Sequence, residues 1–250
     1  MDFSLDKYEH LLESITVQDL PIYTVKNWIV KKPKRGVLLR NDVDRLPINA
    51  LNKARLESKY NIFSTYYFRA TQGNFPQKII KEIADLGHEI GYHYEDLVTA
   101  QGNKKKALYL FQKNLTSLRK IVPVQTVAMH GNPLSTYDNY ELLNSNILNR
   151  FNLIGDAHKT INYLDIYYFT DTGRNWSDKS PNIRDKVKSN KKCMLISTDQ
   201  LIDFIRKYPS AKIAIVTHPE RWNNNLIKWL FYFLFDTTVN LIKKTIISYH

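Results

Sequence analysis

The 250-residue sequence contains a single cysteine, Cys193. One thiol cannot form a disulfide within the chain or build a zinc cluster of thiolates, so neither is expected. The first ten residues carry acidic side chains where a secretory signal requires a basic segment and then an apolar one. We therefore predict a cytoplasmic location, which includes the inner face of the membrane.

No apolar run is long and clean enough to cross a bilayer, which takes roughly 20 residues. Residues 226–235 are nearly all apolar, but Lys228 interrupts them and Asp236 follows them. Two interpretations of residues 224–250 remain open. They form a closing helix packed on the rest of the protein, or an interfacial helix whose aromatic side chains enter the head-group region while its lysines meet anionic lipid.

Acidic residues are fewer than basic ones. The chain has 36 Lys and Arg against 24 Asp and Glu, a net charge of +12, which favours an anionic partner such as nucleic acid, an acidic glycan or lipid head groups. The basic residues form short groups at 31–35, 104–106 and 191–192, without a zinc-finger, RNP or basic-zipper pattern. Because they form no stripe with base-stacking aromatics, we expect no nucleic-acid partner.

Short apolar runs alternate with amphipathic stretches along most of the chain. Extended segments are predicted at 37–40, 62–68, 88–94, 126–130, 162–170 and 212–217, and helices at 48–59, 75–86, 105–121, 137–144 and 200–208. This alternation is typical of a parallel sheet with crossover helices, closed or nearly closed into a barrel. We predict one α/β domain: an N-terminal extension over 1–35 packed on the barrel, the barrel over 36–223, and an apolar C-terminal helix over 224–250.

Carboxylates and histidines follow several of the predicted strands. In barrels and open parallel sheets, ligands bind at the carboxyl ends of the strands. Carboxylates and imidazoles around a divalent cation supply an activated water, and the same side-chain types take and give protons. The strand ends therefore predict a metal-dependent hydrolytic site. The residues at these positions are Asp42, Asp44, His93, His130, Asp171 and His218.

Four segments resemble, in content and order, the NodB-type polysaccharide deacetylases of carbohydrate esterase family 4. They are Asn-Asp-Val-Asp-Arg at 41–45, Ser-Thr-Tyr-Tyr-Phe-Arg at 64–69, Gly-His-Glu-Ile-Gly-Tyr-His at 87–93 and Thr-His-Pro at 217–219. The resemblance covers residues 37–222, and 87–93 is its most specific part. It implies a distorted (β/α)7-type barrel, a divalent metal that is most often zinc, and removal of an N-acetyl group from a sugar.

The resemblance also implies a role for each matching residue. Asp42 is similar in position to the general base, which takes a proton from the attacking water. His218 is similar in position to the general acid, which protonates the departing sugar amine. Asp44 matches the carboxylate ligand of the metal, and His93 matches its first histidine ligand.

The sequence departs from the family pattern at two places. The family has a second metal histidine four residues after the first, where this chain has Leu97, and an Arg-x-Pro-Tyr segment where this chain has His-Gly-Asn-Pro at 130–133. We hypothesise that His130 supplies the missing ligand from the neighbouring strand end. Glu95 is the second candidate.

Three further residues are predicted to contact the substrate. Residues 171–176 resemble a segment that orients the catalytic groups in some family members, so Asp171 or Arg174 would brace the base. A turn stabilised by Asp and Gly is the alternative. Trp222, close after His218, would stack on a sugar ring or pack in the interior.

Two functional hypotheses follow. The first is a metal-dependent carbohydrate N-deacetylase of surface polysaccharide or glycolipid biosynthesis, acting on an N-acetylated sugar or a lipid-linked glycan, with peripheral membrane contact through the C-terminal helix. The second is a catalytically impaired relative that binds glycan or a membrane surface, because the second histidine and the Arg-x-Pro-Tyr segment are missing.

Overall fold

The computed structural model describes residues 1–132, 135–176 and 187–248, so Pro133 of the 130–133 segment lies outside it. The strands are β1 (Ile22–Tyr23), β2 (Gly36–Val43), β3 (Thr65–Phe68), β4 (Glu89–Tyr94), β5 (Thr126–Met129), β6 (Gly155–Asp156), β7 (Tyr167–Thr170) and β8 (Lys212–Thr217). The helices are α1 (Leu5–Val17), α2 (Val25–Lys31), α3 (Pro47–Lys59), α4 (Gln77–Asp85), α5 (Asp96–Thr99), α6 (Lys104–Arg119), α7 (Ser145–Arg150), α8 (Thr198–Lys207) and α9 (Leu226–Ser248), with short 3-10 turns η1 (Asn139–Glu141) and η2 (Pro219–Arg221).

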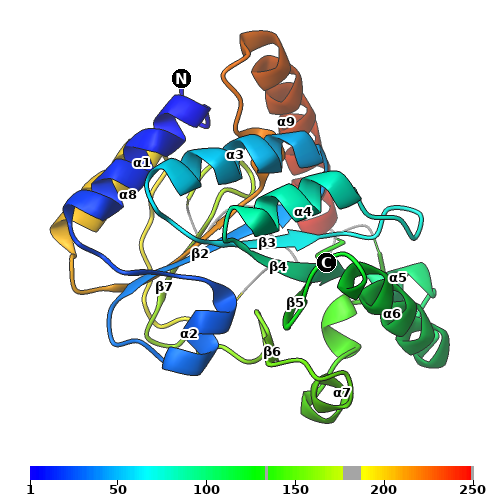
Figure 1. The fold of residues 1–250 in the computed structure, drawn as a ribbon. Coiled ribbons are helices and arrows are strands. Elements are labelled where there is room, and N and C mark those ends of the chain that lie inside the picture. The colour runs from blue at the N-terminus through cyan, green and yellow to red at the C-terminus, as the bar shows by residue number, and fades with distance from the viewer. Residues whose placement is uncertain (133–134, 177–186, 249–250) are drawn as a thin grey trace.

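The strands form one parallel sheet in the order β6-β5-β4-β3-β2-β8-β7, and β1 pairs with β2 beside this path. The sheet curls so that helices lie around its outer side (Figure 1). Among the described residues, β6 and β7 are the two ends of this path, and no pairing joins them. The predicted single α/β domain with a distorted (β/α)7-type barrel is confirmed.

Apolar side chains fill both sides of the sheet. On β2, Leu38 joins the cluster inside the barrel, where Trp28 of α2 and Tyr67 of β3 also lie. Val37 and Leu39 join the cluster between the sheet and the helices α1 and α8. This alternation continues along the strand, because successive side chains point to opposite faces. Arg40 and Asp42 therefore point into the barrel, as Leu38 does.

One predicted helix is wrong. The segment 137–144 is not a single helix: it contains the short turn η1, and α7 starts only at Ser145. The cause is local hydrogen bonding by two side chains, which competes with helix continuation. Asp138 accepts from the backbone N–H of Tyr140, and Asn144 accepts from that of Ile147 as the N-cap of α7.

The C-terminal segment forms the apolar helix α9. Its Asp236 is buried and pairs with Arg174, with 2.9 Å between Oδ2 and Nε. The Trp229 indole N–H donates to the carbonyl of Asp2, 2.8 Å away. These contacts fix one face of α9 against the body of the protein. Among the described residues, no helix combines the length and the apolar character that crossing a bilayer requires.

Candidate active site

The ends of four strands on one rim of the sheet bring the predicted residues together. Asp42 ends the inward-facing row of β2 and Asp44 follows that strand, His93 lies in β4, His130 follows β5, and His218 follows β8. These strands lie within the continuous order β5-β4-β3-β2-β8, all parallel, so their carboxyl ends share one rim.

Asp44 lies at the centre of this group. Its Oδ1 is 3.4 Å from Nε2 of His93 and 3.4 Å from Nε2 of His130, and its Oδ2 is 4.0 Å from Nε2 of His218. Burial raises the pKa of Asp44, but the imidazoles of His130 and His93 outweigh it and hold this pKa well below its usual range. The structure thus brings Asp44, His93 and His130 to one point.

The three side chains suit a divalent cation chemically. Asp44 Oδ1 is buried and makes no hydrogen bond, and the two imidazole nitrogens face it at 3.4 Å. Tetrahedral zinc with bonds of about 2.0–2.1 Å separates its ligand atoms by roughly 3.4 Å, and the two distances from Asp44 Oδ1 to the imidazole nitrogens have this value. Within the described part of the chain, no three His, Cys, Asp or Glu side chains are placed as the ligands of a metal ion, so the ion belongs to the proposed function below.

The ring of His93 is oriented by a backbone group. Its Nδ1 lies 3.0 Å from the carbonyl oxygen of Ala128, which can only accept, so Nδ1 carries the proton. In this tautomer it is Nε2, the nitrogen that can bind a cation, that faces the site. Nε2 also lies 3.6 Å from Oδ2 of Asp42. A partner on the far nitrogen is what fixes a histidine ligand in metal sites.

His130 has a carboxylate behind it. Nδ1 of His130 lies 3.4 Å from Oε2 of Glu95, and both oxygens of Glu95 accept from Arg69, at 2.7 Å. Burial raises the pKa of Glu95, but His130 and Arg69 bring it down to about 2. Burial lowers the pKa of His130, but Asp44 and Glu95 raise it to about 9. Of the two candidates for the missing ligand, His130 contacts Asp44, and Glu95 contacts the opposite nitrogen of the His130 ring.

Asp42 is held by an arginine that the sequence analysis missed. Arg40 donates from Nε and Nη2 to the two oxygens of Asp42, at 2.7 and 2.6 Å, and both side chains are buried. Such a bidentate pair fixes the orientation of a carboxylate as well as its charge. The signal was available, because residues two apart on a strand share a face.

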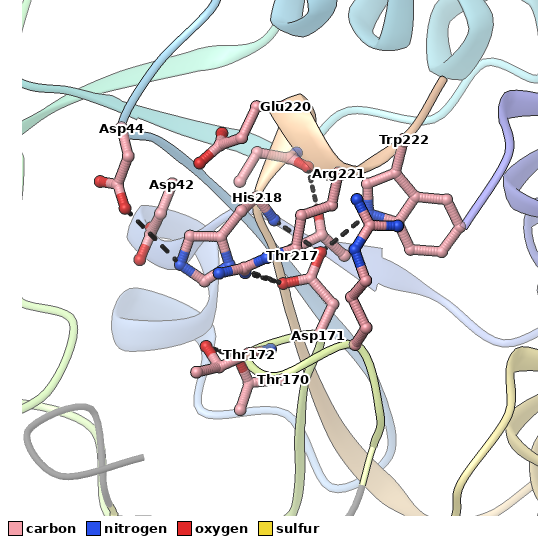
Figure 2. Close-up of polar contacts among 12 residues, drawn as sticks. Asp42, Asp44, Thr170, Asp171, Thr172, Thr217, His218, Glu220, Arg221 and Trp222 are labelled. Carbon is pink, nitrogen blue, oxygen red and sulfur yellow. Dashed lines mark hydrogen bonds and ion pairs between the residues drawn. The ribbon is translucent and has the colours of Figure 1, made fainter. Parts of the chain in front are cut away.

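His218 is supported by Asp171, which follows β7. Nδ1 of His218 donates to Oδ1 of Asp171 at 2.6 Å, and its backbone N–H donates to Oδ2 at 2.8 Å. The imidazole lies between Asp171 and Asp44 (Figure 2). Burial and Arg221 lower the pKa of His218, but Asp171 and Asp44 outweigh them and raise it. Nδ1 is held by Asp171, so it is Nε2 that faces the site.

Asp171 also accepts from Nη1 of Arg221 at 2.7 Å and from the indole N–H of Trp222 at 2.8 Å (Figure 2). Burial raises the pKa of Asp171, but Arg221 and His218 hold it far below its usual range. Residues 171–174 also form the turn considered from the sequence, with the N–H of Arg174 donating to the carbonyl of Asp171 at 2.9 Å.

The predicted substrate-contacting residues lie in the interior. Asp171 is fully buried, and Trp222, 1% exposed, packs against Phe3, Tyr8 and Trp176. Arg174 is paired with Asp236 of α9. The structure thus places Asp171 and Trp222 behind His218 and Arg174 beneath α9.

Two buried charged groups lay outside the sequence predictions. Glu220 of η2 is 1% exposed, neither of its carboxylate oxygens has a hydrogen-bond partner, and burial together with Asp44 raises its pKa to about 7. Its carboxylate points toward the side on which Asp42 and Asp44 lie (Figure 2). The signal was its place two residues after His218.

Lys53 of α3 is the other buried charge. It donates to Oδ1 of Asn41 at 2.6 Å and to the hydroxyl of Thr217, so one ammonium bridges β2 and β8 next to Asp42 and His218. Burial lowers the pKa of Lys53 to about 8. No short-range pattern in the sequence marks this contact, since 164 residues separate Lys53 from Thr217.

No protein-family model matches the chain, and no curated protein matches it in sequence. Solved structures are similar to it. A CE4 family pseudoenzyme from Bacillus anthracis is 14% identical over 84% of this chain and 60% of its own, with a TM-score of 0.46. The match thus spans less than two thirds of that protein.

Two further solved structures are similar. A CE4 esterase from Streptococcus mutans is 10% identical over 92% of this chain and 89% of its own, with a TM-score of 0.48. The peptidoglycan deacetylase PdaC from Bacillus subtilis is 14% identical over 72% and 86%, with a TM-score of 0.40. Because these similarities are low, we infer function from the site itself.

Proposed function

We propose that this protein is a metal-dependent hydrolase that removes the N-acetyl group from a sugar. The observation that supports this is the meeting of Asp44 Oδ1, without a hydrogen-bond donor, with Nε2 of His93 and of His130 at 3.4 Å each. These three residues would hold the divalent cation, and one carboxylate with two imidazoles favours zinc. When bound, the cation polarises the acetamide carbonyl and lowers the pKa of water.

The residues around this centre supply proton transfers. Asp42, fixed by Arg40, lies 3.6 Å from His93 and takes the proton of the attacking water. His218, whose Nδ1 proton is held by Asp171, carries a second proton on Nε2 and gives it to the departing amine. Asp171 holds the ring of His218 in place, and Trp222 donates a hydrogen bond to Asp171. Arg174 pairs with Asp236 and so connects this region to α9.

A catalytically impaired glycan-binding protein is the second candidate. The specific observation in its favour is that Leu97, at the position of the family's second metal histidine, is 2% exposed and packs in the core. That position contributes no ligand, so cation binding depends on His130. The cytoplasmic location and the place in polysaccharide or glycolipid biosynthesis remain predictions.

Metal analysis combined with acetate release separates the two candidates. We expect purified protein to bind about one equivalent of zinc and to release acetate and free amine from N-acetylated sugar oligomers. Asp44→Asn and His130→Ala should lose zinc and activity together, whereas Asp42→Asn should keep zinc and lose activity. Asp203→Asn, on an exposed carboxylate of α8, is the matched control. Zinc binding without turnover would favour the impaired protein, and full zinc affinity in His130→Ala would refute the ligand assignment.

A further inference from the structure

The outer face of α9 is apolar over residues 226–235. Trp229 and Tyr232 are half-buried and Asp236 is buried, so these three turn toward the body of the protein. At 3.6 residues per turn, the opposite side carries two adjacent rows with four-residue spacing. Their exposed fractions run from 42% to 80%. We call these residues the apolar stripe: Leu226, Ile227, Leu230, Phe231, Leu234 and Phe235.

A stripe of this kind needs an explanation. An ordinary surface helix turns its apolar side toward the core, whereas α9 turns a second apolar side to the outside. Contiguous exposed apolar patches on folded proteins mark sites of interaction with a partner or a membrane.

The stripe reaches the rim of the candidate active site. The guanidinium of Arg45 lies over the ring of Phe235, 4.6 Å from its centroid, and Arg45 directly follows Asp44. On the inner side of the same turn, Asp236 lies 3.4 Å from Arg221, the residue that donates to Asp171. Whatever covers the stripe therefore lies beside Arg45, the residue that follows Asp44.

The charges on α9 select the occupant. Its sequence contains three lysines, at 228, 243 and 244, and one acidic residue, Asp236, which is turned inward and paired. Lys228 is exposed beside the stripe. A bilayer with anionic lipids offers both an apolar layer and negative charge to such a helix. A second copy of the chain would bring the same lysines to this face, and the one acidic residue of its α9 is already paired with Arg174, so that helix offers no free carboxylate to Lys228.

We propose that the apolar stripe docks on an anionic membrane surface and holds the rim of the active site at the lipid head groups. The second half of the inference rests on the proposed deacetylase function: the substrate is a glycan attached to a lipid of that membrane. Its sugar reaches Asp42 and His218 while its lipid chain stays in the bilayer.

Vesicle flotation with the full chain tests the docking directly. The probes are vesicles of phosphatidylcholine with and without phosphatidylglycerol. We expect wild-type protein to float with the phosphatidylglycerol vesicles. The double variant Leu230→Gln, Phe231→Gln should bind these vesicles at least about tenfold more weakly than the wild type. The matched control, Val17→Gln with Val30→Gln, removes exposed apolar side chains from α1 and α2 and should bind as the wild type does.

Three outcomes would overturn the docking: no flotation of wild-type protein, equal binding by the stripe variant, or equal loss in the control. A dimer in solution that dissociates in the stripe variant would assign the stripe to a second copy instead. Circular dichroism should show the native helix content in both variants, because all substituted residues are exposed.

A measurement of activity separates the proposed membrane docking from the proposed deacetylase function. Acetate release is measured with wild-type protein from an N-acetylated hexosamine attached to lipid, in vesicles with and without phosphatidylglycerol, and from a soluble N-acetylated sugar. We expect release from the lipid-attached sugar to be several-fold faster in the anionic vesicles. Release from the soluble sugar without vesicle binding would refute docking and leave the proposed function standing. Vesicle binding without any release would refute the proposed function and leave docking standing.

Discussion

Asp171 is the residue whose substitution we expect to lower the free energy of unfolding most. Its carboxylate is fully buried and accepts four hydrogen bonds, two from His218 and one each from Arg221 and Trp222. Asp171→Asn keeps the shape of the side chain but removes its charge. Arg221 would then remain buried without its closest carboxylate, and its nearest remaining ion pair is the 3.4 Å contact with Asp236.

The magnitude follows from the burial of this pair. Breaking a buried, hydrogen-bonded ion pair by neutralising one partner costs about 3–5 kcal/mol, because the other charge stays desolvated. For a chain of this length, 1 kcal/mol corresponds to about 2–4 °C in melting temperature. Asp171→Asn should therefore unfold about 6–20 °C below wild type.

Thermal and urea denaturation followed by circular dichroism measure this loss. Asp199→Asn is the matched control, because Asp199 pairs with Lys7 at 2.7 Å but its side chain is 68% exposed. Exposed pairs contribute about 0–1 kcal/mol. If the two variants were equally stable, the buried pair would not stabilise the fold as argued.

The stability difference between wild type and Asp171→Asn also depends on pH. The pKa of Asp171 is lowered in the folded protein, so the unfolded chain binds its proton first, near an ordinary aspartate pKa of about 3.9. The contribution of Asp171 is complete above that value and is lost as the pH falls through the folded pKa. We expect a constant difference from about pH 5 to 8 and a shrinking one below about pH 4.

Three further predictions concern the neighbouring groups. Glu95→Gln should weaken zinc binding about 10–100-fold in chelator competition, because Glu95 orients His130; Glu82→Gln, on an exposed pair, should not change it, and equal affinities in both would remove this role. Leu97→His should lower the free energy of unfolding by about 2–4 kcal/mol, since the side chain is in the core; a urea midpoint equal to wild type would contradict this. Lys53 has a pKa of about 8 in the folded protein against an ordinary lysine value of 10.5. Between these values the unfolded chain binds more protons, so the stability of the wild type rises with pH by up to about 3 kcal/mol. Lys53→Met should lack this rise in urea titrations from pH 7.5 to about 10, and a parallel rise in the variant would refute the assignment.

The convergence of the strand-end residues could be predicted because it depends on rules with few exceptions. Parallel strands joined by helices put their carboxyl ends on one rim, so Asp44, His93 and His130 needed only a correct strand assignment. The structure brings these three together as expected, and their roles as ligands stay a prediction.

The supporting contacts could not be predicted in the same way. Which strand lies beside which decides that Asp171 faces His218, and the spacing in sequence does not contain that order. The pairing of Arg40 with Asp42 is local and could have been found. Glu220 and Lys53 are buried charges whose environment depends on packing of distant segments. The segment 137–144 misled because Asp138 and Asn144 bond their own backbone.

The ion pairs of Asp236 with Arg174 and Arg221 tie one face of the last helix to the protein's interior. A chain cut after residue 225 would lose not only a hydrophobic surface but the carboxylate that neutralises two guanidinium groups. Arg221 would then have lost its contact with Asp236, and its charge would act mainly on Asp171, the residue that orients the proposed acid. Shortening the protein to improve its handling would therefore change the chemistry of the rim, and any comparison of full-length and shortened forms has to account for both losses.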